Sequence, residues 1–118
     1  MAALAPWSSI WWPLLVETAQ KGGSTQADII NKVARGHTVG WPVDGGYLLL
    51  DRATDDALVI WVGVGEGVRN WMRNAERDVS EFAREIGCTK LRIEGRKGWR
   101  RILPHWQVVD AETLELEL

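Results

Sequence analysis

The strongest hydrophobic pattern in the chain spans residues 57–94 and predicts a strand, a helix and a second strand. Residues 58–64 carry no charge, as expected of a strand buried on both faces, and they lead directly into Gly65-Glu66-Gly67. Apolar residues then recur at helical spacing over 68–86, and a glycine follows them. Residues 90–94 alternate polar and apolar side chains. Because a helix separates the two strands, we expect them to lie parallel in one sheet.

Two helices are predicted before this unit. Apolar residues at helical spacing over 7–21 indicate the first helix, and Pro13 places its start or a kink. Thr25 and Asp28 have the spacing of a capping box, so they mark the start of the second helix. Gly36 lies just beyond its expected end.

The remaining elements are shorter. The pattern predicts strands at 38–41 and 47–51, an antiparallel hairpin from the latter into the strand at 57, a short helix at 99–103 and a strand at 113–118. The order predicts one α/β (α+β) domain over residues 1–118, with a mixed central sheet of about five or six strands and helices packed on it. Its ends are a tryptophan-rich helical segment at 1–23 and a strand or arm at 111–118.

Composition agrees with a single globular domain. The chain has 118 residues, of which 46% are hydrophobic. The net charge of -2 conceals an asymmetry, because residues 67–109 hold ten Lys or Arg and five Asp or Glu, whereas 110–118 hold four acids and no base. A single cysteine, Cys88, excludes an intramolecular disulfide and is consistent with a reducing compartment. Without a signal-peptide pattern or a long apolar run, we expect a cytoplasmic protein with no membrane partner.

Eight tryptophans are an unusually large number for a chain of this length. Trp61 and Trp71 fall at core-facing positions of the predicted strand and helix. Others cluster near the N-terminus, where a hydrophobic surface could contact a partner, and the C-terminal strand has an apolar face that could add a strand to a second copy. The candidate contact residues are therefore Trp7, Trp11, Trp12, Leu114, Leu116 and Leu118.

The order of elements, with the local sequence from Leu58 to Trp106, resembles the Gcn5-related N-acetyltransferase (GNAT) fold. It looks more closely like a group of small proteins of tailed bacteriophages and prophages that carry a degenerate version of this fold. The resemblance covers roughly residues 24–110 and depends mainly on 58–67, the amphipathic helix, 91–99 and 103–106. It implies a GNAT-like domain made in the host cytoplasm, either remaining there or incorporated into the virion.

In catalytic members of the acetyltransferase family, the strand before the long helix ends in R/Q-x-x-G-x-G/A, which holds the pyrophosphate of acetyl-CoA. The matching residues here are 62–67, which retain both glycines but begin with valine. If acetyl-CoA binds, the resemblance assigns it to Val62, Val64, Gly65, Gly67 and Val68. Glu66 would place a carboxylate beside the pyrophosphate and repel it. We therefore expect the glycines to form a turn and no cofactor to bind.

The groups that would transfer protons are also missing from the pattern. Family enzymes commonly use a tyrosine in the helix after the second parallel strand, and the matching residue here is Ile102. The nearest acids, Asp51, Asp55 and Asp56, are expected to be solvated residues in or beside a hairpin turn. We predict no catalytic residue. We also predict no metal site, because neither histidine has a second ligand at a suitable spacing.

One basic cluster surrounds Trp99. It consists of Arg92, Arg96, Lys97, Arg100 and Arg101. Arginine combined with an aromatic ring could hold nucleic acid. We instead expect a solvated helix face with Arg92 on the exposed side of an edge strand and Trp99 turned into the core, because the net charge is negative and no nucleic-acid module is present. A third alternative is contact with an acidic protein surface, including the acidic tail of a neighbouring copy.

Two functions are compatible with these patterns. The first is a non-catalytic phage protein, an interaction or virion-associated component whose partner is another phage or virion protein or a second copy of itself. The alternative is an acetyl-CoA-dependent N-acetyltransferase acting on a small amine or a protein amine, with its rate derived mainly from positioning.

Overall fold

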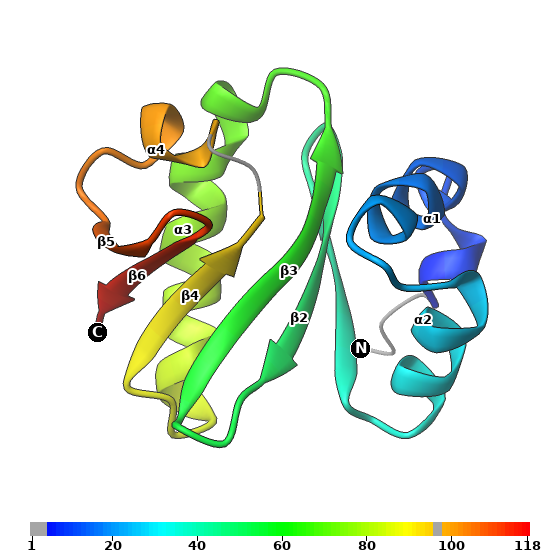
Figure 1. Ribbon diagram of the computed structural model, residues 1–118, viewed down its shortest axis with the longest axis horizontal. Coiled ribbons are helices and arrows are strands. Elements are labelled where there is room, and N and C mark those ends of the chain that lie inside the picture. Colours follow the sequence, from blue (N-terminus) through cyan, green and yellow to red (C-terminus); the bar gives the residue numbers. More distant parts are fainter. Residues whose placement is uncertain (1–4, 96–97) are drawn as a thin grey trace.

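The computed structural model describes residues 5–95 and 98–118, which form one sheet with helices on both faces (Figure 1). Its elements in chain order are the 3₁₀ helix η1 (Pro6–Ser8), α1 (Trp12–Lys21), α2 (Gln26–Ala34), β1 (Thr38–Val43), β2 (Gly46–Arg52), β3 (Ala57–Gly65), α3 (Val68–Glu85), β4 (Lys90–Glu94), α4 (Trp99–Ile102), β5 (Gln107–Asp110) and β6 (Thr113–Glu117). The described residues thus contain four α-helices and six strands, which confirms the predicted α+β class with a mixed sheet.

The strand order in the sheet is β1-β2-β3-β4-β6-β5. β3 and β4 pair in parallel, as predicted for the strand–helix–strand unit, and the other neighbouring strands pair antiparallel. β4 is an interior strand because β6 pairs with its second edge. The expectation that Arg92 lies on an edge strand was therefore wrong. The residues at 113–117 form this inserted strand rather than a free arm.

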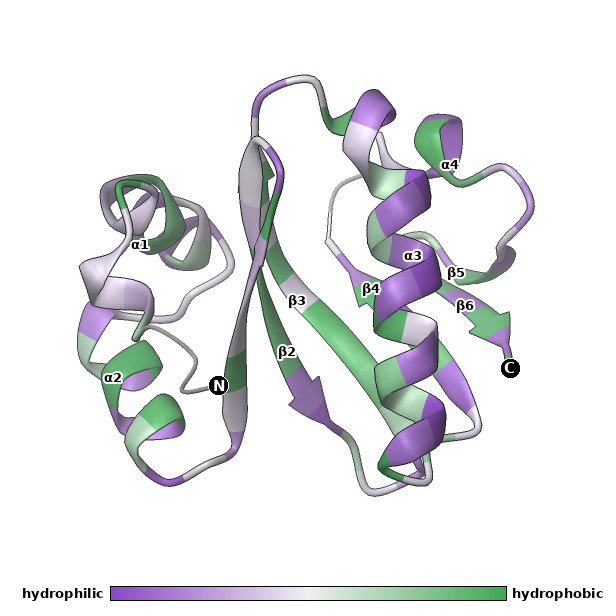
Figure 2. Cartoon of the chain, turned by 180° about the vertical axis from the view of Figure 1, so that it is seen from behind, coloured by the Kyte–Doolittle hydropathy of each residue, from purple (hydrophilic) through white to green (hydrophobic). Residues whose placement is uncertain are grey.

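Two hydrophobic cores lie on opposite faces of the sheet. The core under α3 contains Leu48, Leu50, Leu58, Ile60, Trp71, Met72, Ala75, Val79, Leu91 and Ile93, among others. The core under α1 and α2 contains Leu15, Ala19, Ile29, Tyr47, Leu49, Val62 and Val64. Figure 2 shows both layers from behind, with α3 in front of the sheet and α1 and α2 to one side. The helices thus pack against the sheet through apolar faces, and the residues of these faces recur at helical spacing in the sequence.

A β-bulge in β3 determines which of its side chains face each core. Leu49 pairs with Val62 and Leu50 pairs with Ile60, so Trp61 is the extra residue. Because a one-residue insertion reverses the alternation, Ile60 faces the core under α3 whereas Val62 faces the core under α1. An uncharged strand gives no alternation signal, and the sequence therefore did not reveal this reversal.

The local start signals agree with the structure. Thr25 and Asp28 form the complete capping box at the start of α2. Pro13 lies in the first turn of α1, where its missing N–H is not needed.

One strand, β5, was not predicted, because its four residues are all exposed and have no buried face to impose a pattern. None of the helices in the described part of the chain is long and apolar enough to cross a membrane.

Candidate functional site

The glycine-bearing loop at 65–67 packs against the turn between β1 and β2. The Glu66 N–H donates to the carbonyl oxygen of Gly45 at 2.9 Å, and Trp71 Nε1–H donates to the carbonyl oxygen of Glu66 at 3.1 Å. Gly65 has φ +154°, and a Cβ atom on it would lie 2.5 Å from the Gly45 oxygen. Glycine is thus required here by the close approach of two backbone segments. One N–H of the loop is already used within the protein.

The residues assigned to a cofactor by resemblance have different surroundings. Gly67 caps α3 in the left-handed conformation with φ 62°, and the first turn of α3 contains no acid. Val68 packs at the margin of the core under α3. Val62 and Val64 are buried in the core under α1. The side chains of Val62 and Val64 therefore lie in one core and that of Val68 at the margin of the other, whereas Gly65 and Gly67 contribute only backbone and lie with Val68 at the start of α3.

Trp99 occupies the space where β3 and β4 are no longer paired. The parallel pairing ends at Ile60 and Ile93, although β3 continues to residue 65. A Cβ atom on Gly63 would lie 3.4 Å from the ring of Trp99, which places the indole against β3 at this point. The side chain that begins α4 thus packs against β3 beyond the end of its pairing with β4, at the margin of the core under α3.

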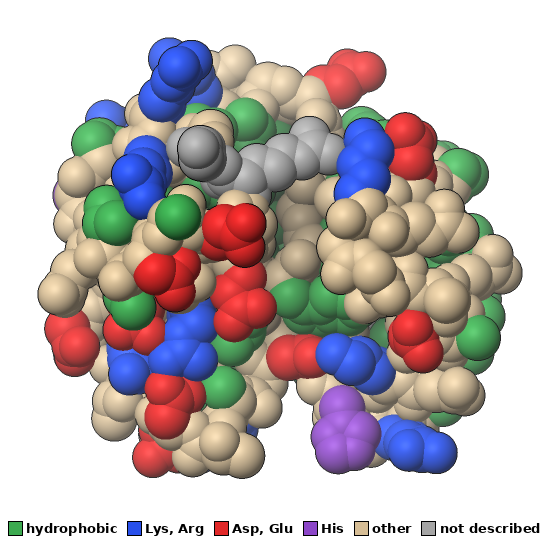
Figure 3. Space-filling view, viewed as in Figure 1, with side chains coloured by type: hydrophobic (Ala, Val, Ile, Leu, Met, Phe, Trp, Pro, Cys, Tyr) green, Lys and Arg blue, Asp and Glu red, His purple; other side chains and the backbone are tan. Residues whose placement is uncertain are grey.

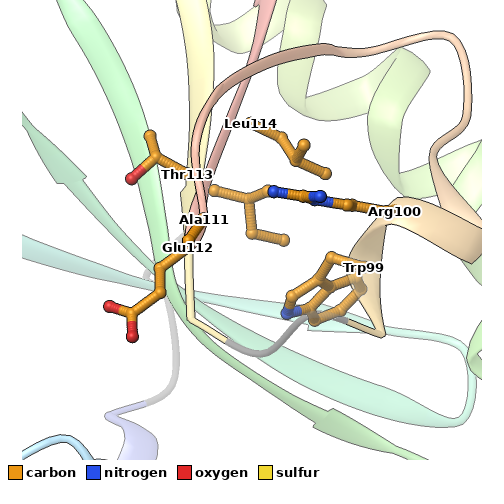
Figure 4. Close-up of a pocket in the computed structure, with 7 residues that line it drawn as sticks. Trp99, Arg100, Ala111, Glu112, Thr113 and Leu114 are labelled. Carbon is orange, nitrogen blue, oxygen red and sulfur yellow. The ribbon is translucent and has the colours of Figure 1, made fainter.

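A small hollow remains beside Trp99. It is lined by Ile93, Trp99, Arg100, Ala111, Glu112, Thr113 and Leu114, and about 10 Å³ of it is open to water-sized molecules. That volume holds about one water molecule. Figure 4 shows Trp99 and Arg100 extending from α4 towards the segment at 111–114. An extended cofactor arm would need Trp99 to move.

The residues considered for proton transfer are not arranged for it. Ile102 is partly buried against the core under α3. Tyr47 is only 2% exposed and lies in the core under α1, where burial raises the pKa of its hydroxyl. The Tyr47 hydroxyl lies in the space that a side chain at position 40 would take, because a Cβ atom on Gly40 would lie 2.3 Å from the hydroxyl oxygen of Tyr47.

Asp51 has a role that the sequence did not indicate. It lies in β2, as the predicted strand at 47–51 requires, but it is not a solvated residue beside the turn. Its carboxylate accepts hydrogen bonds from Lys32 Nζ at 3.0 Å, from Trp61 Nε1 at 3.1 Å and from the buried hydroxyl of Thr38. Lys32 Nζ also lies 4.4 Å from the centre of the Trp61 ring, within cation–π range. Asp51 therefore joins α2, β1, β2 and the bulge of β3.

This polar cluster forms one wall of an open hollow of about 560 Å³. Its lining residues are Ser24, Asp28, Asn31, Lys32, Arg35, His37, Asp51 and Arg52. Figure 3 shows a hollow between the helical layer and the rest of the molecule, with acidic, basic and histidine side chains at one end. Both charge signs are present along its wall. Among the described residues, no group of three His, Cys, Asp or Glu side chains could hold a metal ion.

Of the basic cluster predicted around Trp99, Arg92 and Arg100 are bound to other groups of the protein. Arg92 is bound to Asp55 and to Glu115, the latter at 2.7 Å, and Lys90 lies 3.4 Å from Asp55 and 3.7 Å from Glu115. The hydrogen bond from Arg92 lowers the pKa of Asp55 to about 2. Arg100 donates to the carbonyl oxygen of Asp110 at 3.1 Å.

The remaining members of that cluster are Arg96, Lys97 and Arg101. Arg101 is exposed on α4. Arg96 and Lys97 lie outside the described residues. The charge of Arg92 is compensated by two carboxylates, so it is not available as a member of one continuous basic surface.

The N-terminal candidates form a surface that we call the N-terminal patch: Trp7, Ile10, Trp11, Trp12 and Leu14. Trp7, Ile10 and Leu14 are 42%, 88% and 39% exposed, and the described part of the chain has only two other exposed large hydrophobic residues. Trp12 is partly buried and packs edge-on against Trp7, with ring centres 6.3 Å apart. Apolar exposure is therefore concentrated in eight residues of sequence.

The C-terminal candidates lie mostly inside the molecule. Leu114 is 3% exposed in the core under α3, and Leu116 and Leu118 pack partly buried against the same core. Burial removes Leu114 from the surface, so it is not available to a partner. Val108 and Val109 on β5 are instead about half exposed. In the sequence, Val108 and Val109 stand out only as an apolar pair beside polar residues.

Comparison with known proteins gives no match to this chain among protein-family models, curated proteins or solved structures.

Proposed function

We propose that the chain is a non-catalytic protein with a degenerate GNAT-like fold, a phage-encoded interaction or virion-associated component made in the host cytoplasm. Its partner would be another phage or virion protein or a second copy of itself. The observation that carries the proposal is the N-terminal patch, where Trp7, Ile10 and Leu14 expose apolar surface side by side in the sequence. Contiguous apolar exposure of this kind is typical of protein contact sites.

The chemistry of the patch supports a protein partner. Residues 5–16 contain no charged side chain. An uncharged surface can face an identical copy of itself without like-charge repulsion, as a two-fold symmetric contact requires. Tryptophan is also among the residues that contribute most to binding energy at protein interfaces.

The area around the glycine loop supports the absence of catalysis. The Glu66 N–H is bonded to Gly45, and Trp99 packs against Gly63 of β3 beyond the end of the pairing with β4. Ile102 has no proton to transfer. An acetyltransferase would need Trp99 to leave its place and a proton donor from another element.

The proposal is tested by sedimentation of matched surface variants. The test variant is Ile10→Ser/Leu14→Ser, and the control is Val108→Ser/Val109→Ser, which removes two exposed apolar side chains from β5. We expect the native protein to self-associate between micromolar and millimolar concentration, or to sediment with virion particles from cells carrying its genome. The control should behave like the native protein, whereas the test variant should remain unassociated. The proposal fails if the native protein is a monomer absent from particles, or if both variants associate like the native protein.

A further inference from the structure

The outer face of α3 carries a row of arginines, which we call the arginine ridge: Arg69, Arg73 and Arg77. They recur every four residues, so neighbours are about 6 Å apart along the helix axis. All three are exposed, and every exposed side chain of α3 from residue 69 to 77 is either one of these arginines or Asn70 or Asn74. The hydrophobic side of the helix faces the sheet, and the hydrophilic side faces outwards (Figure 2).

The ridge has little local charge compensation. Within the described residues, the side chains of Arg69, Arg73, Asn70 and Asn74 make no hydrogen bond or ion pair. Arg77 Nε lies 3.3 Å from Oδ1 of Asp78, and both side chains of this ion pair are more than half exposed. Such exposed pairs neutralise charge weakly.

Three acids, Glu66, Glu76 and Asp78, lie beside the ridge. Glu76 is held by His105 Nε2 at 2.6 Å and by the indole N–H of Trp106. Glu66 is exposed just before the first turn of α3. Asp78 is paired with Arg77, and Glu81 and Glu85 lie further along α3, so the two ridge arginines without a carboxylate partner within the described part of the chain are Arg69 and Arg73.

This arrangement does not serve the stability of the helix. Like charges four residues apart repel each other, and the ridge contains two such pairs. Arg69 lies in the first turn, where the helix dipole is already positive and where acids are the favourable residues. A polyanion lying along the helix would convert this repulsion into attraction.

We propose that the arginine ridge binds the phosphate backbone of nucleic acid, with Asn70 and Asn74 as additional donors to phosphate or sugar oxygens. Arginine grips phosphate through two parallel N–H donors, and asparagine is a common partner of the same oxygens. A row of equally spaced guanidinium groups is complementary to a chain with a regularly repeated negative charge.

This inference goes beyond the proposed function and concerns a different surface. α3 covers the face of the sheet opposite to α1, which carries the N-terminal patch. A protein partner and a nucleic acid could therefore be bound together. From the sequence, we expected no nucleic-acid partner because of the net charge and the nature of the cluster around Trp99. The arginine ridge is identified by the exposure of the side chains along α3.

The test is fluorescence anisotropy of labelled single- and double-stranded oligonucleotides at a series of salt concentrations. The ridge variant is Arg69→Gln/Arg73→Gln, and the control, Lys21→Gln/Arg35→Gln, removes the same charge from exposed positions elsewhere. We expect the native protein to bind at low salt. Because each phosphate contact contributes about 0.9 to the slope of log K against log salt on duplex DNA, the ridge variant should lower that slope by about 1.8. The control should bind within about twofold of the native protein.

Two further measurements make the result decisive. Circular dichroism should show the ridge variant melting at or above the native temperature, because a like-charge pair has been removed. Glu66→Gln should bind more tightly than the native protein, since it removes an acid next to the ridge. The proposal is overturned if no oligonucleotide binds at low salt, if the control loses as much affinity as the ridge variant, or if poly-glutamate binds as well as DNA, which would indicate an acidic protein partner.

Discussion

At the residue scale, Asp51 connects more elements than any pattern in the sequence suggested. Its carboxylate accepts from Thr38, Trp61 and Lys32, which come from β1, β3 and α2. From sequence alone, an aspartate before a predicted turn is indistinguishable from a solvated turn residue. Its partners are 13, 10 and 19 residues away, so the cluster depends on the sheet register.

We predict that the two ends of this cluster differ in importance. Asp51→Ala should lower the free energy of unfolding by about 1–3 kcal/mol, because it leaves the Thr38 hydroxyl and the Trp61 N–H without their acceptor. Lys32→Met should cost less than about 1 kcal/mol, since Lys32 is 43% exposed and its ion pair is screened by water. Urea denaturation of both variants measures the difference. Equal losses would contradict the assignment of Asp51 as the centre of the cluster.

Asp55 provides a pH-dependent contribution to stability. Its pKa is lowered to about 2 in the folded protein by the hydrogen bond from Arg92. A carboxylate with a lowered pKa stabilises the fold above its ordinary pKa and loses that effect as the pH falls through the folded value. The contribution should therefore be complete at neutral pH and disappear between about pH 4 and pH 2.

The comparison of native protein with Asp55→Asn isolates this effect from other acids. We expect the native protein to be the more stable of the two at pH 7 and the difference to shrink between about pH 4 and pH 2. Urea denaturation at several pH values gives the difference directly. A difference that remains constant over that range would show that the charge of Asp55 is not involved.

At the element scale, the loop between β3 and α3 is built by backbone contact. Gly65 and Gly46 lie where the loop crosses the β1–β2 turn, and a Cβ atom on Gly46 would lie 2.4 Å from the carbonyl oxygen of Val64. Of these two, Gly65 belongs with Gly67 to the glycines that match part of a cofactor motif. Their spacing alone could not distinguish between binding and packing, because both require a backbone free of side chains.

A pair of glycine variants separates close packing from backbone strain. Gly65→Ala should lower the free energy of unfolding by roughly 1–3 kcal/mol more than Gly95→Ala, because both residues have positive φ but only Gly65 has backbone atoms within 3 Å of the new Cβ. No described atom lies within 4 Å of a Cβ on Gly95. Thermal or urea unfolding of the two variants measures the difference. Equal destabilisation would mean that the loop can shift away from the turn.

The order of the main elements could be predicted because each carried a local signal. The apolar period of α3, the capping box of α2 and the alternation of β4 all correspond to elements observed in the structure. The features that could not be predicted depend on distant partners. They include the bulge at Trp61, the insertion of β6 between β4 and β5, and the ion pairs that remove Arg92 from the basic surface.

The candidate site was less predictable than the fold for the same reason. The exposure of Trp7 agrees with its choice as a contact residue, whereas Leu114 alternates as an exposed strand would and is buried. Alternation shows that a strand has two faces but does not show which face is covered. Trp99 was expected to turn into the core and does pack against it, but its position against Gly63 depends on the tertiary placement of α4 and could not be predicted.

At the scale of the whole molecule, three features support an interaction protein. The N-terminal patch exposes apolar side chains on the α1 layer, the arginine ridge lies on the α3 layer, and Trp99 packs against β3 at Gly63. The first two features lie on opposite faces of the sheet. At the glycine loop, the Glu66 N–H is already bonded to the carbonyl oxygen of Gly45.

Titration calorimetry of the native protein with acetyl-CoA and with CoA tests this account most directly. Binding would require displacement of Trp99 and a phosphate site beside Glu66, so we predict no heat of binding even at millimolar ligand. The Trp99→Ala variant serves as a control for access to the space that the indole occupies beside Gly63 of β3. Micromolar binding of acetyl-CoA to the native protein would contradict the account and would indicate an acetyltransferase.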